Sequence, residues 1–225
     1  MRFESLTLET RDVQAITTFY TEIMGLVATR AETEQTSFQI GATELTFKQF
    51  TGDQASCYHF AIEIPPNQID EAGAWLASRV PILPFQGKTL VEHQAWNAKA
   101  YYFTDAGGNV VELIARGAPV KSARKKVFNQ TSLLRVSEVG LVVPSVKRFC
   151  EQLNVLMEIP YYQEPSEDFA AMGDEEGLLI VSVSGRGWIP INLPARPHTV
   201  ILRMKGNVNR RWIPNGLPYI LDSHT

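Results

Sequence analysis

The chain begins with a strand pattern that runs into a helix pattern. Residues 5–10 alternate apolar and polar side chains, as a half-buried strand does, and residues 13–24 then place four apolar side chains at helical spacing. Gly25 is typical of a helix end, and residues 38–40 and 44–47 have the composition of short strands. The opening of the chain therefore predicts a strand, a helix and further strands.

The same order returns in a second unit. A strand is predicted at residues 58–64, and two prolines separate it from a helix predicted at residues 69–78. Two more strands, at residues 101–103 and 110–114, flank a Gly-Gly turn. The repetition indicates that this unit has the architecture of the first.

A third unit follows, and a fourth begins. The third has a strand at residues 138–143, a helix at 146–153, and strands at 169–173 and 178–183. Another strand-like run covers residues 198–203, and no helix pattern follows it in this sequence. The pattern thus predicts three units and part of a fourth.

Three segments resemble signatures of the vicinal oxygen chelate superfamily, which includes glyoxalase I, extradiol ring-cleaving dioxygenases and bleomycin-resistance proteins. Residues 16–26 resemble its FY-x-x-x-x-G-L signature, and residues 59–64 its H-I-A-F-x-V strand. Residues 102–113 are similar to Y-F-x-D-P-D-G-N-x-x-E-L, with Ala106-Gly107 in place of Pro-Asp. The resemblance is specific for fold and says little about the reaction.

The resemblance implies an α+β fold built from βαβββ modules, in which two modules curl around a cavity. We expect paired modules over residues 1–115 (1–53 and 57–115), a linker at 116–131, and a third module with a C-terminal extension at 132–225. An unpaired third module would expose an open sheet. It should therefore pack on the first two modules or pair with another copy, and a homodimer is our hypothesis.

Composition narrows the function classes. The 225 residues are 44% hydrophobic, and the formal net charge is -3, which gives no large field for nucleic acid or anionic lipid. No apolar run is long enough to cross a membrane, and the N-terminus lacks the layout of a signal peptide. We therefore expect a cytoplasmic protein that acts on a small molecule, with neither nucleic acid nor membrane as partner.

Strand alternation brings one histidine and one carboxylate to the same side of the second unit. Glu112 shares a strand face with Val110 and Ile114, and His59 shares one with Ala61. Both faces are opposite the apolar stripe that packs under the helix, and in the resembled family this side lines the cavity. By position, His59 and Glu112 match two of that family's metal ligands. Such a pair suits Fe(II), Mn(II), Zn(II) or Ni(II).

The rest of a metal site does not follow the family pattern. Ser5 stands where the first module should supply another ligand, and Leu45 or Phe47 stands where a glyoxalase has a carboxylate. His93 and Glu9 are candidate third ligands outside the family positions. The site therefore holds a divalent metal or, as the alternative, none.

Further candidates lie in other units. Glu138 occupies the place of the module-opening histidine in the third unit, and His198 would occupy it in the fourth, so the two together would form a second, vestigial site. Ser5, Trp96 and Tyr102 are candidate substrate-binding residues, the last two as part of an aromatic wall. For each of these residues an ordinary structural role is the alternative.

Three functions remain open from the sequence. The first is a metal-dependent enzyme of the glyoxalase or extradiol dioxygenase type, in which the metal chelates vicinal oxygens of the substrate. The second is a metal-free binding protein of the bleomycin-resistance type. The third is a degenerate relative that works by assembly, through the segments at residues 188–190 and 212–214, which both read Trp-Ile-Pro.

Overall fold

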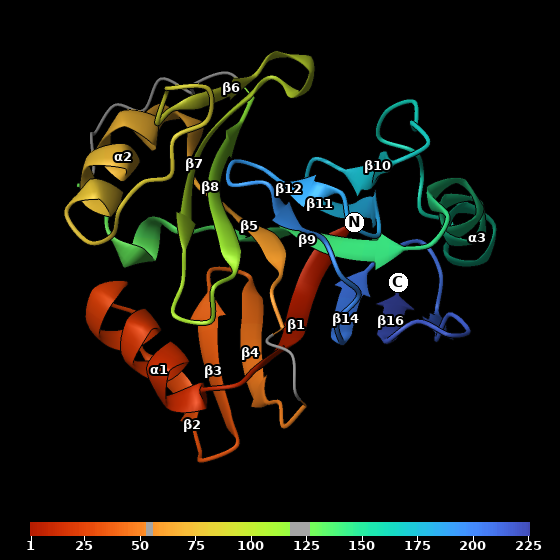
Figure 1. Ribbon diagram of the computed structural model, residues 1–225, viewed down its shortest axis with the longest axis horizontal. Helices are drawn as coiled ribbons and strands as arrows, with labels where there is room; N and C mark the ends of the chain where they lie inside the picture. The colour runs from red at the N-terminus through yellow and green to blue at the C-terminus, as the bar shows by residue number, and fades with distance from the viewer. Residues whose placement is uncertain (53–55, 118–126) are drawn as a thin grey trace.

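Two mixed sheets of seven strands each form the protein. The computed structural model describes residues 1–52, 56–117 and 127–225. Figure 1 shows the sheets one above the other, with α1 and α2 at one end of the molecule and α3 at the opposite end. The arrangement is α+β, as the sequence predicts, and corresponds to about two pairs of modules.

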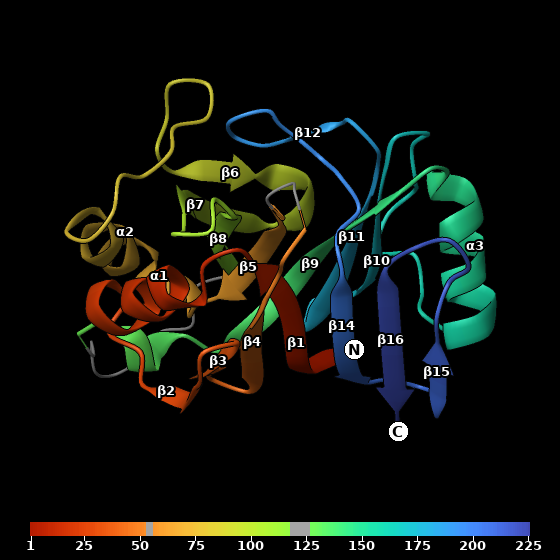
Figure 2. The same ribbon diagram turned by 60° about the horizontal axis from the view of Figure 1, so that its bottom comes forward.

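The first sheet combines the beginning of the chain with its end. Its strand order is β15-β16-β14-β1-β4-β3-β2. Figure 2 shows β14 beside β1, with β16 and β15 beyond it. The strands are β1 (Arg2–Thr10), β2 (Ala28–Ala31), β3 (Gln35–Ile40), β4 (Thr43–Gln49), β14 (Val200–Lys205), β15 (Arg210–Trp212) and β16 (Tyr219–His224).

The second sheet combines the middle of the chain with the third unit. Its strand order is β10-β11-β9-β5-β8-β7-β6. A separate two-stranded hairpin, β12 with β13, follows β11 along the chain. The strands are β5 (His59–Glu63), β6 (Val91–His93), β7 (Ala98–Thr104), β8 (Val110–Arg116), β9 (Arg135–Val143), β10 (Phe169–Asp174), β11 (Gly177–Val183), β12 (Gly187–Trp188) and β13 (Leu193–Pro194).

Each of the three predicted helices is present and begins with local signals. Helix α1 (Val13–Thr18) starts where the Asp12 side chain accepts a hydrogen bond from the Ala15 amide, and it continues as a π-helical turn over Phe19–Ile23. Helix α2 (Ile69–Ala77) follows a short 3-10 turn at Pro66–Gln68. Helix α3 (Val146–Met157) is capped by Ser145 and buries the apolar stripe expected from its spacing.

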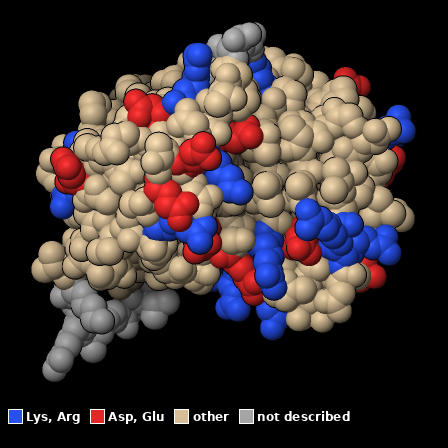
Figure 3. Space-filling view, turned by 90° about the horizontal axis from the view of Figure 1, so that it is seen from below, with Lys and Arg blue, Asp and Glu red and all other residues tan. Residues whose placement is uncertain are grey.

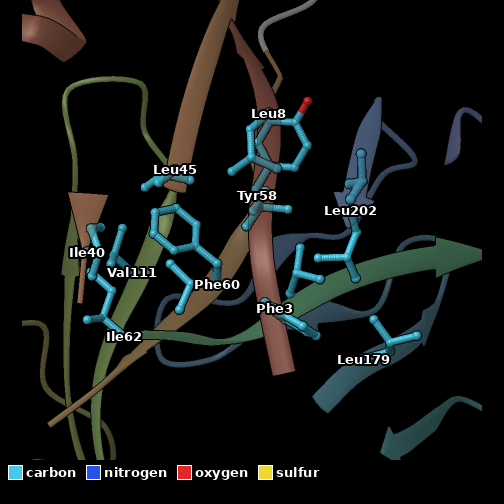
Figure 4. Packing of buried hydrophobic residues seen from close by; sticks show 14 of the residues in the cluster. Phe3, Leu8, Ile40, Leu45, Tyr58, Phe60, Ile62, Val111, Leu179 and Leu202 are labelled. Carbon is cyan, nitrogen blue, oxygen red and sulfur yellow. The ribbon is translucent and has the colours of Figure 1, made fainter. Parts of the chain in front are cut away.

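The main core lies between the two sheets and under the helices. Phe60 and Ile62 of β5 are fully buried, and Figure 4 shows them near Leu45 of β4 and Ile40 of β3. Burying this apolar face of β5 turns the alternate residues, beginning with His59, to the other side of the sheet. The core therefore determines which side chains face the cavity.

The modules pair differently from the pairing we expected. Strand β5 of the second unit hydrogen-bonds to β9 of the third, and β1 of the first unit to β14 of the fourth. The first and second modules therefore share a core but not a sheet, so the cavity of the second unit is completed by the third. Each module has a free edge strand that can pair with several others, and the local sequence pattern does not choose between them.

The open sheet that motivated a homodimer is closed within the chain by this pairing. The homodimer itself stays a prediction, as do the domain boundaries 1–115, 116–131 and 132–225. Most of the predicted linker, residues 118–126, lies outside the described residues. Arg116, at its beginning, is the last residue of β8 and is buried.

The surface carries charges of both signs. In the face shown in Figure 3, acidic and basic side chains are mixed, and neither forms a continuous field. Among the described residues, none of the helices is both long and apolar enough to cross a membrane. That nucleic acid is not the partner stays a prediction from the low net charge.

Candidate metal centre

Three ionisable side chains meet on the face of the second sheet that is turned away from the core. Ala61, in the central strand β5, pairs with Glu112 of β8 on one side and with Glu138 of β9 on the other. His59 lies two residues before Ala61 and shares its face. The strand register therefore brings two carboxylates and one imidazole together.

The spacing of these three groups suits a shared cation. The Nε2 atom of His59 lies 3.7 Å from Oε2 of Glu112 and 3.8 Å from Oε2 of Glu138. One ligand atom from each of the three residues lies within 4.8 Å of the other two. Two ligands that are each about 2.1 Å from one ion lie at most about 4.2 Å apart, so small side-chain adjustments complete the site. The group could hold a metal ion.

His59 is oriented as a metal ligand requires. Its Nδ1 lies 3.2 Å from the backbone oxygen of Val110, and an Nδ1–H donor to that carbonyl leaves Nε2 as the free lone pair. Burial alone would lower the pKa of His59, but the Glu138 and Glu112 carboxylates raise it above its ordinary value.

Glu112 has an unsatisfied oxygen. Its Oε1 is buried and has no hydrogen-bond partner among the described residues. Burial, followed by the charge of Glu138, raises the pKa of Glu112 to about 8. A buried carboxylate with a free oxygen is costly unless a cation compensates it, so this atom fits the metal hypothesis.

An arginine completes the charge pattern behind Glu138. The Nη2 atom of Arg116 donates to Oε1 of Glu138, and its Nη1 donates to Oγ of Ser137 at 2.9 Å. The side chains of Arg116 and Glu138 are 3% and 2% exposed. This pair leaves Oε2 of Glu138 to face His59.

A cavity of about 130 Å³ opens over these residues. The ring of Trp188 lies 5.3 Å from that of His59 and packs against Gly140, where an added Cβ would come within 2.8 Å of the indole. Arg186 lies over the Phe169 ring at the same cavity. The lining residues are His59, His93, Trp96, Tyr102, Glu112, Glu138, Phe169, Ile180, Arg186, Trp188 and Ile189.

Most of the residues predicted for the site in the second unit are at this cavity. Trp96 and Tyr102 line it, and Trp96 stacks on Phe169 with ring centroids 6.3 Å apart. The Nε2 atom of His93 is 2.9 Å from the Tyr102 hydroxyl and 3.8 Å from Oε1 of Glu112. His93 is therefore a neighbour of the three-residue group, beside Glu112.

The candidates from the first unit are not at this cavity. Ser5 lies on β1 in the first sheet, where it pairs with Glu44 and Arg203, and Glu9 lies further along the same strand. Neither is among the lining residues. The structure thus gives Ser5 no contact with the cavity in which Trp96 and Tyr102 lie.

Glu138 and His198 do not form the second site that we considered. Glu138 joins His59 and Glu112, whereas the His198 ring packs edge-on against Tyr58 at 5.6 Å. Glu138 was a candidate, but its partners were missed because the pairing of β5 with β9 was unknown. The sequence signal that could have identified Glu138 as a ligand beside His59 is its position, which is that of the module-opening histidine in the third unit.

The register also identifies a fourth position in this site. In the second unit the carboxylate of Glu112 pairs with Ala61, two residues after His59. In the third unit the residue paired with Gly140, two residues after Glu138, is Ile180. Three of the four equivalent positions therefore hold ionisable side chains, and the fourth holds the apolar Ile180.

The first sheet lacks such a group at the matching positions. In the first unit, the residue two after Ser5 pairs with Thr46. In the fourth unit, Ile201 occupies the position of Glu138, and the residue two after it pairs with Asp222. Thr46 shares a hydrogen bond of 2.8 Å with Ser37. Of these four matching positions, only Asp222 supplies a metal-binding side chain, so the two sheets are not equivalent in chemistry.

Comparison with known proteins identifies the fold. No protein family defined from sequence matches this chain, and no curated relative matches it in sequence. A candidate dioxygenase from Bacillus subtilis has a similar structure, with a TM-score of 0.62, 15% identity, and coverage of 91% of this chain and 70% of the other. A glyoxalase I mutant from Zea mays has a TM-score of 0.61, 14% identity, and coverage of 99% of this chain and 93% of its own.

A second glyoxalase I mutant from Zea mays has a TM-score of 0.54 at 15% identity and covers 89% of this chain and 74% of its own. Identities this low establish the fold and leave the reaction open. The fold agrees with the three signature segments in the sequence. This chain has the fold of the vicinal oxygen chelate proteins.

Proposed function

We propose that this protein is a metal-dependent enzyme of the extradiol dioxygenase or glyoxalase type, acting on a small molecule that presents two neighbouring oxygens. The observation that carries the proposal is the convergence of His59, Glu112 and Glu138 at one buried point. An imidazole and two carboxylates suit Fe(II), Mn(II), Zn(II) or Ni(II). A metal bound there would act as a Lewis acid toward the substrate oxygens.

The number of ligands supports the dioxygenase type. With Ile180 at the fourth position, three protein ligands remain, as in the 2-His-1-carboxylate sites that leave open positions for substrate. Here Glu138 stands in for one of the two histidines. His59, Glu112 and Glu138 would hold the metal from one side and leave the cavity side to the substrate.

The cavity walls suggest a compact and partly apolar substrate. A volume of about 130 Å³ has room for a single ring or a short chain. Trp96, Phe169 and Trp188 supply flat apolar walls. The Tyr102 hydroxyl, fixed by His93 at 2.9 Å, is a polar group able to orient a substrate oxygen.

A second candidate function is a metal-free binding protein. The ion pair between Arg116 and Glu138 favours it, because it satisfies one oxygen of this carboxylate without a cation. In that case Nε2 of His59 faces the side chains of Glu112 and Glu138 without a shared metal ion. A thermal-shift screen in which small ligands stabilise the protein, and divalent metals do not, would support this alternative.

The test is metal reconstitution. Chelator-treated protein is loaded separately with Fe(II), Mn(II), Zn(II) and Ni(II), and bound metal per chain is measured after gel filtration. We expect about one ion per chain for at least one metal. His59→Ala should lower the affinity for that metal at least about 100-fold, because losing a ligand costs more than losing an outer partner of one.

His198→Ala is the matched control, since this histidine packs against Tyr58 outside the cavity. It should retain the wild-type metal affinity. If none of the four metals binds, or if the two histidine variants bind metal equally, the site is not a metal centre.

A further inference from the structure

We propose that Arg116 sets the charge of the metal site, so that the loaded cavity selects a small anion that chelates through two oxygens. The inference rests on the proposed function and adds a positioning residue and a substrate class to it. Arg116 is the last residue of β8 and shares the strand face of Glu112 and Ile114. Its guanidinium reaches Glu138 and Ser137 from behind the site.

The charges of the buried groups support this role. A 2-His-1-carboxylate site carries one negative charge, whereas His59, Glu112 and Glu138 carry two when His59 is the neutral ligand. Arg116 is permanently cationic and brings the sum back to one negative charge. The positive charge of Arg116 thereby offsets the extra negative charge that Glu138 brings by standing where such sites have a second histidine.

The remaining charged residue of the cavity lining, Arg186, does not change this sum. Arg186 has a carboxylate neighbour, with its Nε 3.7 Å from Oδ2 of Asp168. With a divalent ion the site carries one net positive charge.

A positive charge in a buried cavity is costly unless the ligand neutralises it. Bidentate coordination by an anion supplies that neutralisation, whereas a neutral diol leaves the charge uncompensated. The expected substrate class is therefore a small carboxylate or enolate with a second oxygen next to the first.

Comparison with a nearby ion pair separates this role from ordinary strand pairing. Arg135 of β9 and Glu63 of β5 also form an ion pair between strands of this sheet, but their side chains are 19% and 11% exposed and lie outside the cavity lining. The pair of Arg116 with Glu138 is almost fully buried, where an ion pair adds little net stability. Arg135→Gln is therefore the matched control for variants of Arg116.

The experiment measures Mn(II) affinity first and then oxalate affinity of the Mn(II)-loaded protein, both by calorimetry, with ethylene glycol as the neutral bidentate probe. In Arg116→Gln we expect Mn(II) to bind at least about ten-fold more tightly and oxalate at least about ten-fold more weakly, because the site gains one negative charge. Arg116→Lys and Arg135→Gln should keep both affinities near those of the wild type. The affinity for ethylene glycol should not fall in Arg116→Gln as the affinity for oxalate does.

A charge-conserving double variant covers the case in which Arg116→Gln fails to fold. Glu138→His combined with Arg116→Gln restores one negative charge with two histidines and one carboxylate, and should bind oxalate as the wild type does. Failure of the wild type to bind Mn(II) overturns the proposed function and this inference together. Equal oxalate affinity in wild type, Arg116→Gln and Arg116→Lys overturns the inference alone, as does weaker Mn(II) binding in Arg116→Gln.

Discussion

At the residue scale, Glu112 carries the largest electrostatic cost in the site. It is 2% exposed, one of its oxygens is unpaired, and the negative charge of Glu138 raises its pKa further after the effect of burial. Folding without a metal therefore favours the protonated form of Glu112. A metal ion and a proton would compete for the same oxygens of Glu112. Metal affinity should therefore rise as pH rises toward the Glu112 pKa of about 8.

This competition predicts how pH changes the stability of the metal-free protein. The pKa of Glu112 rises from 4.5 to about 8 on folding, so its contribution to stability is complete below pH 4.5 and is lost as pH rises through about 8. The raised pKa of His59 acts in the same direction. Urea unfolding in the presence of chelator should show lower stability at pH 9 than at pH 5.

Glu112→Gln should reduce this dependence, because the variant has no proton to lose at that position. It should be more stable than the wild type at pH 9 and close to it at pH 5. Glu44→Gln, an exposed carboxylate on the other sheet, should retain the wild-type profile. A wild-type protein that is equally stable at both pH values would contradict the buried, protonated state of Glu112.

The sequence predicted the faces of individual residues better than their partners. Alternation placed His59 and Glu112 on the side away from the core, and both lie there. Arg116 was assigned to the linker, because a glycine and a proline follow it closely, although it is the last residue of β8. Its partner Glu138 is 22 residues further along the chain, and local spacing has no information on such a contact.

At the element scale, strand register is what assembles the site. The sequence predicted several strands because their buried residues alternate with more exposed ones, as in β1 and β14. Strand β2 (Ala28–Ala31) was not predicted, since it is an edge strand with mostly exposed residues and no alternation. The site depends on central strands, so missing the edges did not affect its position.

The turn between β3 and β4 gives a prediction about local packing. Gly41 has φ +52°, and a Cβ there would lie 1.9 Å from the backbone oxygen of Leu134, which also accepts the Ala42 amide. Gly41→Ala should therefore lower the free energy of unfolding by more than about 3 kcal/mol, from strain and from lost contact with the segment before β9. Urea unfolding at constant m-value measures this loss.

Gly87→Ala separates the two causes. Gly87 also has a positive φ, +79°, but no atom lies within 4 Å of the position of its Cβ. The free energy of unfolding of this variant should fall only by the cost of placing an alanine in the left-handed backbone conformation, about 1 to 2 kcal/mol. Equal losses at Gly41 and Gly87 would show that the contact with Leu134 adds nothing.

At the scale of the whole molecule, the two sheets are connected by buried tyrosine hydroxyls as well as by the core. The Tyr58 hydroxyl accepts from the Glu9 amide and donates to the Thr199 oxygen, which links the start of the second sheet to the first. On the other side, Tyr219 of β16 bonds to Val142 of β9. These contacts join modules that are far apart in sequence, so periodicity alone gave no sign of them.

Tyr219 gives the prediction for the whole fold. Its hydroxyl lies 2.7 Å from the amide nitrogen and 2.6 Å from the carbonyl oxygen of Val142, and the ring is 1% exposed. Tyr219→Phe keeps the ring against Phe149 but leaves the two backbone groups without this partner, which should cost about 1 to 3 kcal/mol. Since the two sheets share one core, unfolding should remain a single transition.

The control is Tyr161→Phe, because the Tyr161 side chain is partly exposed and distant in sequence from both connecting tyrosines. It should change the free energy of unfolding by less than about 0.5 kcal/mol. If Tyr219→Phe were as stable as the wild type, the hydroxyl would not connect the sheets. If it unfolded in two steps, with the tryptophan fluorescence changing before the far-ultraviolet signal, the sheet that holds the candidate site would be a separate folding unit, contrary to the shared core.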